Sequence, residues 1–408
     1  MTFKELGLDE AVIEAISYMG FEKATPIQEQ AIPEIMKGRD LLACAQTGTG
    51  KTAAFILPII HNLTVNKATE LTTTLVIVPT RELAVQIDQQ IQGFSYFVPV
   101  SSIAIYGGGD GDNWDVQKKA LSTGTNIIVA TPGKLLSHLQ MGYVKFDHIE
   151  YLILDEADRM LDMGFIEDIQ KIISYLPKKR QNLLFSATMA NKIKTFAHQL
   201  LHDHFEISIS ISKPAEGVLQ AAYLTFNEQK VPLLKILIDK NTEYDSILIF
   251  SSTKRKVFDI VRALGGEKKS VHGISSDLEQ SEREAVLANF KAKRTRVLVA
   301  TDVLSRGIDI KDINLVVNFD VPKQAEDYVH RVGRTARAET TGVALSLINP
   351  DDMQKFHHIE KLIEREVPKL ALPPELGEGP VWKVHSTDRK KRSNFKKGVS
   401  RHKPRGKG

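Results

Sequence analysis

Short runs of apolar, mostly β-branched residues recur along the chain, separated by stretches with helical periodicity. In the first half they are Leu41–Ala45, Leu75–Val78, Ile103–Tyr106, Ile127–Ala130, Leu152–Leu154 and Leu183–Phe185. In the second half they are Ile247–Phe250, Val297–Ala300, Leu315–Phe319, Val343–Ile348 and a shorter run before His272. Because these runs are continuous rather than alternating, each predicts a strand covered on both faces. Strands separated by helices in this way predict an α/β protein with parallel sheets.

The pattern divides into two parts. The chain has 408 residues, enough for two or three compact domains. The periodicity weakens around Ser208–Gly217 and is lost after Pro368. We therefore expect one α/β domain over residues 1–210, a second over 217–365, and a linker with a basic tail, disordered in isolation, over 366–408.

Positive charge is concentrated at the C-terminus. Residues Lys383–Gly408 hold 11 of the 54 lysines and arginines and one of the 50 acidic residues. The other 382 residues carry 43 bases and 49 acids, so a mildly acidic body precedes a strongly basic tail. Such a tail predicts a tether that binds nucleic acid without reading its sequence.

The remaining composition excludes several classes of protein. The single cysteine, Cys44, excludes an intramolecular disulfide framework, fits a reducing compartment and is expected to be a buried core residue. No run of about 18 apolar residues predicts a membrane helix, and Met1–Leu6 does not resemble a secretory signal. The histidines lack metal-ligand spacing, so we expect no zinc site. The sequence predicts a cytoplasmic protein.

A glycine-rich segment, Ala45–Thr52, stands between an apolar run and an apolar helical stretch, which is the setting of a phosphate-binding loop. Its glycines allow backbone N–H groups to face phosphates, and the following helix N-terminus adds a positive dipole end. Lys51 would supply a charge to the phosphates and Thr52 a hydroxyl to Mg²⁺. The loop residues expected to bind the nucleotide are Gln46, Thr47, Gly48, Thr49 and Gly50.

A second element supports the same chemistry. Tyr151–Glu156 is an apolar strand that ends in two carboxylates, the form of a Walker B element. Asp155 is expected to hold Mg²⁺, and Glu156 to orient and deprotonate the water that attacks the γ-phosphate. Acids also favour a helix start, so this pair alone would be ambiguous. Its combination with the glycine-rich segment favours an ATP site.

Further short motifs follow one another along the chain. They are Phe21 with Ala24–Gln28, Pro79–Ala84, Gly107–Gly108, Thr131–Lys134, Asp155–Asp158, Ser186–Thr188, Val299–Asp302, Arg306–Asp309 and His330–Arg337. Their order is typical of the DEAD-box RNA helicases, and the chain resembles that family over about residues 1–365. The resemblance implies two tandem RecA-like domains that close around ATP and single-stranded RNA. Within the family, the chain looks most similar to the bacterial RhlE-type branch.

The resemblance also implies roles at the ATP site. Phe21 would stack on adenine, while Thr25 and Gln28 read the edge of the base. Asp309 would contact the ribose. The expected arginine fingers of the second domain are Arg334 and Arg337. The residues expected to couple hydrolysis to domain closure are Asp158, Ser186, Thr188 and His330.

RNA contacts are implied in the same way. The matching positions are Pro79, Arg81, Gly108, Thr131 and Gly133 in the first domain, and Thr253 and Thr301 in the second. Hydroxyls, backbone N–H groups and arginines bind phosphates without reading bases, which predicts sequence-nonspecific binding of single strands and short duplexes. Lys134 replaces the commoner Arg and loses its bidentate fork. Trp114 is either a loop residue or a base-stacking residue.

Three functions are compatible with these motifs. The first is an RNA-stimulated ATPase that separates short RNA duplexes or remodels RNA–protein complexes, with ribosomal or RNA-decay complexes as candidate partners. The second is a DNA helicase, which Phe21–Gln28 and Ser186–Thr188 disfavour. The third is an ATP-gated RNA clamp with slow turnover. Glu156, Arg334 and Arg337 indicate an active enzyme but do not separate the first function from the third.

Overall fold

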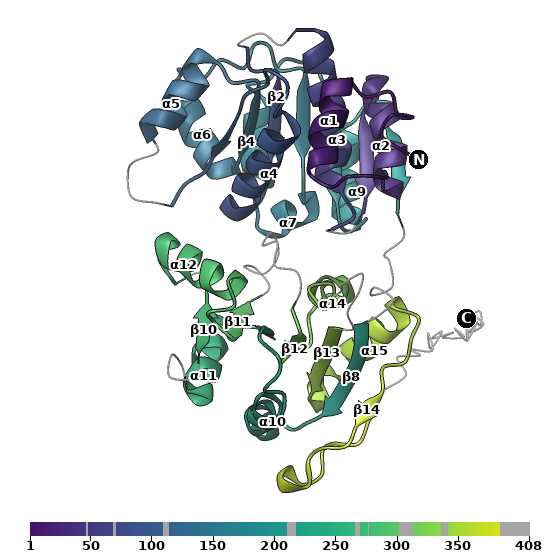
Figure 1. Cartoon of the computed structure of the whole chain (residues 1–408), viewed down its shortest axis with the longest axis vertical. Coiled ribbons are helices and arrows are strands. Elements are labelled where there is room, and N and C mark those ends of the chain that lie inside the picture. The colour runs from purple at the N-terminus through teal and green to yellow at the C-terminus, as the bar shows by residue number, and fades with distance from the viewer. Residues whose placement is uncertain are drawn as a thin grey trace, which may run out of the picture.

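The computed structural model describes residues 1–45, 48–67, 71–108, 114–209, 218–265, 270–275, 277–301, 313–335 and 342–383. Figure 1 shows two α/β domains, one above the other, each built on a single sheet. Both sheets have seven strands, and every strand pairing within them is parallel. The predicted fold class is confirmed.

The first sheet has the order β3-β4-β2-β5-β6-β1-β7. Its strands are β1 (Leu41–Cys44), β2 (Thr74–Ile77), β3 (Ser102–Ile105), β4 (Ile127–Ala130), β5 (Tyr151–Leu154), β6 (Gln181–Ser186) and β7 (Phe205–Ser208). Its helices are α1 (Glu10–Tyr18), α2 (Pro26–Met36), α3 (Lys51–Val65), α4 (Arg81–Phe94), α5 (Trp114–Thr123), α6 (Pro132–Gln140), α7 (Ala157–Asp162), α8 (Ile166–Ile173) and α9 (Asn191–Leu200).

Helices cover both faces of this sheet. Along β1, Leu41 and Ala43 belong to the core beneath α1–α4, whereas Leu42 belongs to the core beneath α5–α9. Successive side chains of a strand point to opposite faces, so a continuous apolar run is the sequence that two covered faces require. Cys44 is buried and unpaired in this sheet, as expected.

The second sheet has the order β10-β11-β9-β12-β13-β8-β14. Its strands are β8 (Val218–Leu224), β9 (Ile247–Ser251), β10 (Val271–Ile274), β11 (Val297–Thr301), β12 (Leu315–Asn318), β13 (Gly342–Ile348) and β14 (Lys369–Leu370). Its helices are α10 (Asn227–Lys240), α11 (Lys254–Leu264), α12 (Gln280–Lys291), α14 (Ala325–Val332) and α15 (Met353–Leu362), with 3₁₀ turns at Pro350–Asp352 and Pro374–Leu376. One core lies beneath α10 and α11; two others, beneath α12 and beneath α14 with α15, cover the opposite face.

The second domain extends past residue 365, the boundary that the sequence predicts for it. Val367 is buried, β14 pairs with β8, and the ring of Trp382 packs edge-on against Phe356 at 6.4 Å. Isolated apolar residues at irregular spacing make these contacts, so no periodic pattern in the sequence predicts them. The basic tail from 384 onward lies outside the described residues, as does the linker from 210 to 217. No helix among the described residues is long and apolar enough to cross a membrane.

Candidate functional site

The sheet order sorts the predicted site residues into two adjacent groups. The carboxyl ends of parallel strands meet at one edge of a sheet, where ligands of such folds bind. In the first domain, the segments after β3, β4 and β2 carry the predicted RNA contacts, whereas those after β5, β6 and β1 carry the predicted nucleotide residues. These two groups of strands are contiguous in the sheet, although along the chain β1 precedes the RNA group and β5 and β6 follow it.

The glycine-rich segment follows β1 and ends where α3 begins. Gly48 and Gly50 have φ of +87° and +92°, the left-handed region that favours glycine. A Cβ at Gly50 would also meet the side-chain amide of Gln28, which would have to shift. The loop therefore has the backbone shape that a phosphate cradle needs. Gln46 and Thr47 lie outside the described residues.

Gln28 connects α2 to this loop. Its amide Nε2 donates to the carbonyl of Gly50 at 3.1 Å, and its Oε1 accepts from the backbone N–H of Thr25 at 2.8 Å. Gln28 is buried, whereas Oγ1 of Thr25 is buried without a hydrogen-bond partner within the described residues. A buried hydroxyl beside the phosphate loop leaves a group for a ligand to satisfy.

Lys51 and Asp155 form a buried pair at the centre of the site. Lys51 Nζ lies 3.9 Å from a carboxylate oxygen of Asp155, and their side chains are 6% and 4% exposed. Within the described residues, Lys51 Nζ has no hydrogen-bond partner. Burial raises the pKa of Asp155 to about 6, against the opposing charge of Lys51. An unsatisfied ammonium and a destabilised carboxylate fit a site built for a phosphate and a divalent cation.

Glu156 occupies a strained position beside this pair. Its φ of 51° and ψ of 47° place a non-glycine residue in the left-handed region, at the turn from β5 into α7. Such backbone strain gathers at functional sites. The carboxylate is held by the guanidinium of Arg159 at 3.2 Å, in a pair that is more than nine-tenths buried. Sequence reasoning missed Arg159, because an arginine one residue after Asp158 carries no chemical signature of its own.

The predicted coupling residues meet in a small hollow between the domains. Asp158 and Thr188 line it from the first domain and His330 from the second. Ser186 donates from its hydroxyl to the carbonyl of Thr188 at 2.7 Å, so it supports the same wall. All four predicted coupling residues therefore lie at one place.

The remaining predicted nucleotide residues are placed only in part. Phe21 is half-buried and packs edge-on against Phe94 at 5.6 Å. Thr52 lies in the first turn of α3, and Arg334 follows the end of α14. Arg337 and Asp309 lie outside the described residues.

On the RNA half of the edge, Arg81 is held by several groups. Its guanidinium donates a hydrogen bond to the carbonyl of Gly108. The guanidinium also stacks on the ring of Tyr106, with 4.4 Å between Cζ and the ring centroid. It forms an ion pair with Glu284 of the second domain at 2.8 Å. The neighbouring Glu82 lies 3.8 Å from Arg283, again across the domains. The ends of α4 and α12 therefore face each other through two reciprocal ion pairs.

The other predicted RNA residues lie at the same edge of their sheets. In the first domain, Pro79 and Thr131 follow β2 and β4, and Gly133 is exposed in the first turn of α6. In the second domain, Thr301 ends β11 and Thr253 caps α11 by accepting from the N–H of Lys256 at 3.3 Å.

The ring of Trp114 packs against other side chains of the protein. Its ring stacks on His138 with 4.0 Å between centroids, and Nζ of Lys134 lies 4.2 Å from the same ring. Burial and the charge of Lys134 lower the pKa of His138 to about 4, so the stacked imidazole is neutral near pH 7. Trp114 begins α5 and is therefore not a loop residue, and its ring supports Lys134; base stacking by Trp114 stays a prediction.

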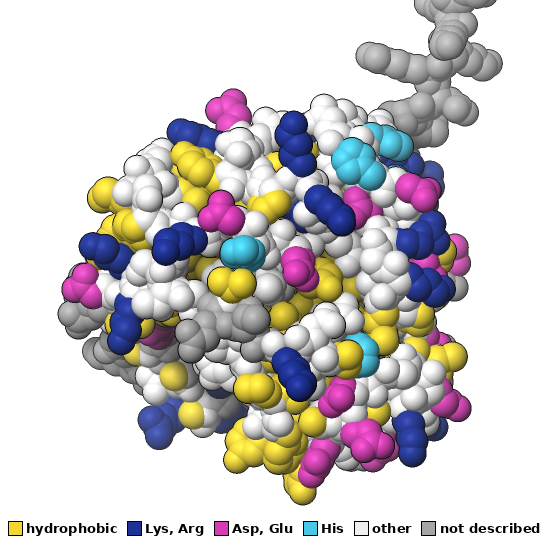
Figure 2. Space-filling view, turned by 90° about the horizontal axis from the view of Figure 1, so that it is seen from above, with side chains coloured by type: hydrophobic (Ala, Val, Ile, Leu, Met, Phe, Trp, Pro, Cys, Tyr) yellow, Lys and Arg dark blue, Asp and Glu magenta, His cyan; other side chains and the backbone are white. Residues whose placement is uncertain are grey.

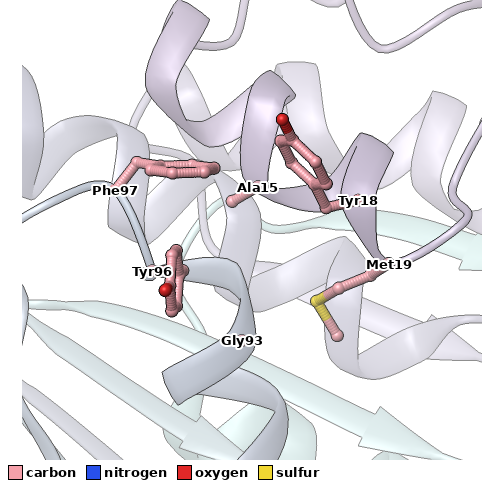
Figure 3. A pocket seen from close by; sticks show the side chains of 6 residues that line it. All are labelled: Ala15, Tyr18, Met19, Gly93, Tyr96 and Phe97. Atoms are coloured by element: carbon pink, nitrogen blue, oxygen red, sulfur yellow. The ribbon is translucent and has the colours of Figure 1, made fainter.

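Two other surface features do not contain predicted site residues. Figure 3 shows an apolar hollow of about 450 Å³ whose wall includes Tyr18, Met19, Tyr96 and Phe97, at the ends of α1 and α4. Figure 2 shows a face on which basic and acidic side chains are interspersed rather than gathered by sign.

Two family models match the chain. A DEAD/DEAH box helicase model matches residues 25–196, and a helicase conserved C-terminal domain model matches residues 229–339. The DEAD-box ATP-dependent RNA helicase CshA of Geobacillus kaustophilus is 41% identical over 379 residues, covering 92% of this chain and 79% of that protein.

Solved structures also match both domains together. Saccharomyces cerevisiae Dbp5 bound to RNA and ADP BeF3 has a TM-score of 0.79 at 29% identity, with 90% of this chain and 95% of that chain covered. A DEAD box protein from Methanococcus jannaschii is 38% identical and has a TM-score of 0.53, over 91% of this chain and 99% of that chain.

Proposed function

Because the chain belongs to the DEAD-box family of ATP-dependent RNA helicases, we propose that RNA bound across its two tandem RecA-like domains triggers hydrolysis of ATP. Closure of the domains on one strand would separate short RNA duplexes or remodel RNA–protein complexes. The observation that carries this proposal is the strand order, which places the predicted RNA and nucleotide residues side by side on one sheet edge. The assignment to the RhlE-type branch stays a prediction.

ATP would bind with its phosphates on the loop around Gly48 and Gly50. The ammonium of Lys51, which has no hydrogen-bond partner among the described residues, would bind the phosphate oxygens. Gln28 would contact the base and connect it to the loop through the hydrogen bond from Gln28 to Gly50. Thr52 and Asp155 would hold Mg²⁺, which would neutralise charge on the phosphates. Support for this arrangement is that Lys51 and Asp155 are both buried, that Lys51 Nζ has no hydrogen-bond partner among the described residues, and that burial raises the pKa of Asp155.

Glu156 would act as the base. It would accept a proton from water as the water oxygen bonds to the γ-phosphorus and the bond to the β–γ bridging oxygen breaks, giving ADP and inorganic phosphate. Arg334, and Arg337 beyond the described residues, would place positive charge on the transferring group from the second domain. Catalysis would then require closure, because the base and the arginines stand on different domains.

RNA would be held through its phosphates by both domains. Helix N-termini, hydroxyls and Arg81 contact backbone rather than bases, so binding would be sequence-nonspecific. Glu284 forms an ion pair with Arg81 in the described structure, so an RNA phosphate would replace the carboxylate of Glu284 as the partner of Arg81. We also propose that the protein is cytoplasmic, that its basic tail tethers RNA, and that its complexes include ribosomal or RNA-decay particles.

Steady-state ATPase assays test the proposal. We expect single-stranded RNA to stimulate turnover and DNA of the same sequence to have little effect. Glu156→Gln should bind ATP and RNA but lose about 100-fold or more in turnover, because a positioned general base contributes roughly that much. Stimulation by DNA as strong as by RNA, or near-normal turnover of the variant, would contradict the proposal.

A further inference from the structure

The two sheets have the same topology. Adding seven to each strand number converts the order of the first sheet into that of the second, from β3-β4-β2-β5-β6-β1-β7 to β10-β11-β9-β12-β13-β8-β14. The counterpart of β5 is therefore β12, and the counterpart of β1 is β8. Asp155 follows β5 and Asp320 follows β12, while Lys51 lies on the helix after β1 and Lys230 on the helix after β8.

These residues form corresponding pairs. Lys230 Nζ lies 3.8 Å from Asp320, as Lys51 Nζ lies 3.9 Å from Asp155, and all four side chains are more than nine-tenths buried. The pairs differ in how they are satisfied. Lys230 donates to the carbonyl of Phe319 at 2.8 Å, whereas Lys51 has no hydrogen-bond partner within the described residues. The pair of the second domain therefore leaves no ammonium for a phosphate.

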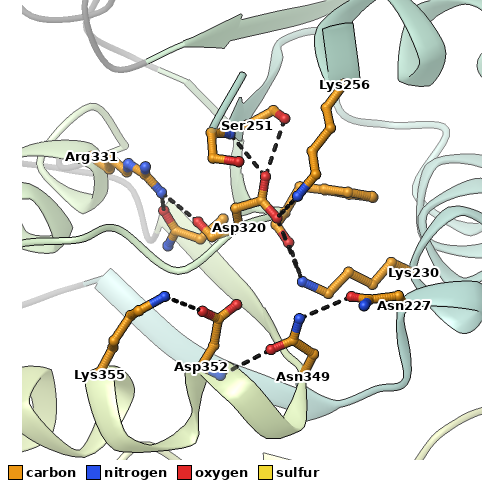
Figure 4. A network of polar contacts seen from close by, with 12 residues as sticks. Asn227, Lys230, Ser251, Lys256, Asp320, Arg331, Asn349, Asp352 and Lys355 are labelled. Carbon is orange, nitrogen blue, oxygen red and sulfur yellow. Dashed lines mark hydrogen bonds and ion pairs between the residues drawn. The ribbon is translucent and has the colours of Figure 1, made fainter. Parts of the chain in front are cut away.

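The carboxylate of Asp320 is bonded to the end of β9 instead (Figure 4). One oxygen accepts from the backbone N–H of Ser252 at 2.8 Å and from Oγ of Ser251 at 3.3 Å, and the other accepts from Lys256 at 2.8 Å. Burial raises the pKa of Asp320, but the hydrogen bonds from Lys256 and Ser252 outweigh it and hold the value at about 2. Asp320 is thus a fixed anion that holds the segment leading to Thr253.

The main chain of the same residue is bonded to α14. Arg331 donates to the carbonyl of Asp320 at 2.7 Å and to the side-chain oxygen of Asn318 at 3.0 Å. Its guanidinium also lies 4.9 Å from the ring centroid of Phe250, the residue before Ser251. Helix α14 carries His330 and leads directly into Arg334. Asp320 therefore touches both the predicted RNA segment and the helix that carries the predicted arginine finger.

We propose that Asp320 is a positioning residue that joins the RNA-contact segment Ser251–Thr253 to α14, so that RNA on the second domain sets Arg334 for catalysis. In this arrangement the buried Lys230–Asp320 pair connects the segment Ser251–Thr253 to α14 instead of binding a nucleotide. The inference rests on the proposed function, because it uses the assigned roles of Thr253 and Arg334.

Two double variants separate the joint from general stability. Both carry Lys230→Met, which removes the buried ammonium that would otherwise lose its counter-charge. Asp320→Asn keeps an acceptor for the N–H of Ser252, whereas Asp320→Ala removes it. We expect the Asn/Met protein to keep its stimulation by RNA. The Ala/Met protein should lose about fivefold or more of that stimulation, with a raised KM for RNA and an unchanged Kd for ATP.

Arg331→Lys tests the joint from its other end. Nη1 of Arg331 donates both to Asn318 and to the carbonyl of Asp320, whereas a lysine side chain ends one bond short of that nitrogen and lacks the planar guanidinium near the ring of Phe250. The Arg331→Lys variant should also lose stimulation by RNA while binding ATP normally, and it covers the case in which Ala/Met does not fold. Asp352→Asn is the matched control, since Asp352 pairs with Lys355 in the same domain without bonding either segment.

The outcomes are distinct. Wild-type stimulation in Ala/Met, or in Arg331→Lys if Ala/Met does not fold, would overturn the inference, as would equal losses in Asn/Met and Ala/Met. Absence of stimulation by RNA in the wild-type protein would instead overturn the proposed function. Trp382, packed against α15, reports by fluorescence whether the second domain of each variant is folded.

Discussion

The buried carboxylate of Asp155 should make the ATP site a source of instability in the ligand-free protein. Its pKa is raised from an ordinary 3.8 to about 6, chiefly by burial. A raised pKa means that the ionised form is less favourable in the folded than in the unfolded state. Each pKa unit corresponds to about 1.4 kcal/mol, so about two units correspond to about 3 kcal/mol at neutral pH. We therefore expect Asp155→Asn to stabilise the first domain by about that amount while abolishing ATP hydrolysis.

The dependence on pH gives the sign of this effect. Wild-type stability falls as pH rises from 3.8 through about 6, because Asp155 ionises more readily in the unfolded chain. The advantage of Asp155→Asn should be complete above about pH 7, fall to about 1 kcal/mol near pH 4.5 and vanish at lower pH. Saturating ATP with Mg²⁺ should reduce the difference by stabilising only the wild-type protein, by about 2.7 kcal/mol at 100 times the Kd.

The two tryptophans make the measurement specific to one domain. Trp114 lies in the first domain and Trp382 in the second, so urea unfolding followed by fluorescence in a Trp382→Phe background reports the first domain alone. Asp158→Asn, three residues along and half-buried, is the matched control. A gain of equal size in the control, no gain at pH 8, or a gain that does not diminish by pH 4.5 would refute the reasoning.

Two further variants follow from other parts of the molecule. Arg159→Gln removes the guanidinium that fixes Glu156. The kcat for ATP hydrolysis should fall about 10- to 100-fold with an unchanged Kd for ATP, as expected for a displaced catalytic group. A hydrolysis rate equal to that of the wild-type protein in pre-steady-state assays would show that Arg159 does not position the base. Deletion of 384–408 should weaken RNA binding and flatten its salt dependence, since each phosphate contact on a single strand contributes roughly 0.7 to the log–log slope. An unchanged slope in fluorescence-anisotropy titrations would mean that the tail does not bind RNA.

The strands that could be predicted from sequence are those buried on both faces. The run at 127–130 is apolar at every position because β4 lies inside the sheet, and β4 is found there. Three strands were not predicted, namely β7, β8 and β14. In β8, buried Val218, Gln220 and Ala222 alternate with more exposed residues, and β14 has only two residues at the sheet edge. Because some positions of β7, β8 and β14 are exposed, these strands lack the continuous apolar run that identifies buried strands.

The site residues that could be predicted are those whose chemistry is local in sequence. Lys51 and Glu156 stand in motifs that report their own function. Glu284 and Asp320 could not be found in this way, because their partners lie on other elements and no spacing encodes the contact. Arg159 stands three residues after Glu156, but that spacing is common to many helical ion pairs and does not by itself identify a functional one. The parallel sheets bring such residues together only after folding, since every strand of a sheet ends at the same edge.

The repeated topology explains why one fold can bind ATP on one domain and respond to it on the other. Both sheets carry a lysine on the helix after β1 or β8 and an aspartate after β5 or β12, and the two pairs have similar separations. What differs is the set of neighbours. Lys51 Nζ has no hydrogen-bond partner within the described residues, so a ligand that supplies one gains affinity. Lys230 and Asp320 are completed by Phe319 and Ser252, so the same pair gives rigidity instead. The Lys51–Asp155 pair is thus completed by a ligand, whereas the Lys230–Asp320 pair is completed by the protein. This difference lets ligand binding on the first domain shift the equilibrium toward the closed state while the second domain keeps its shape.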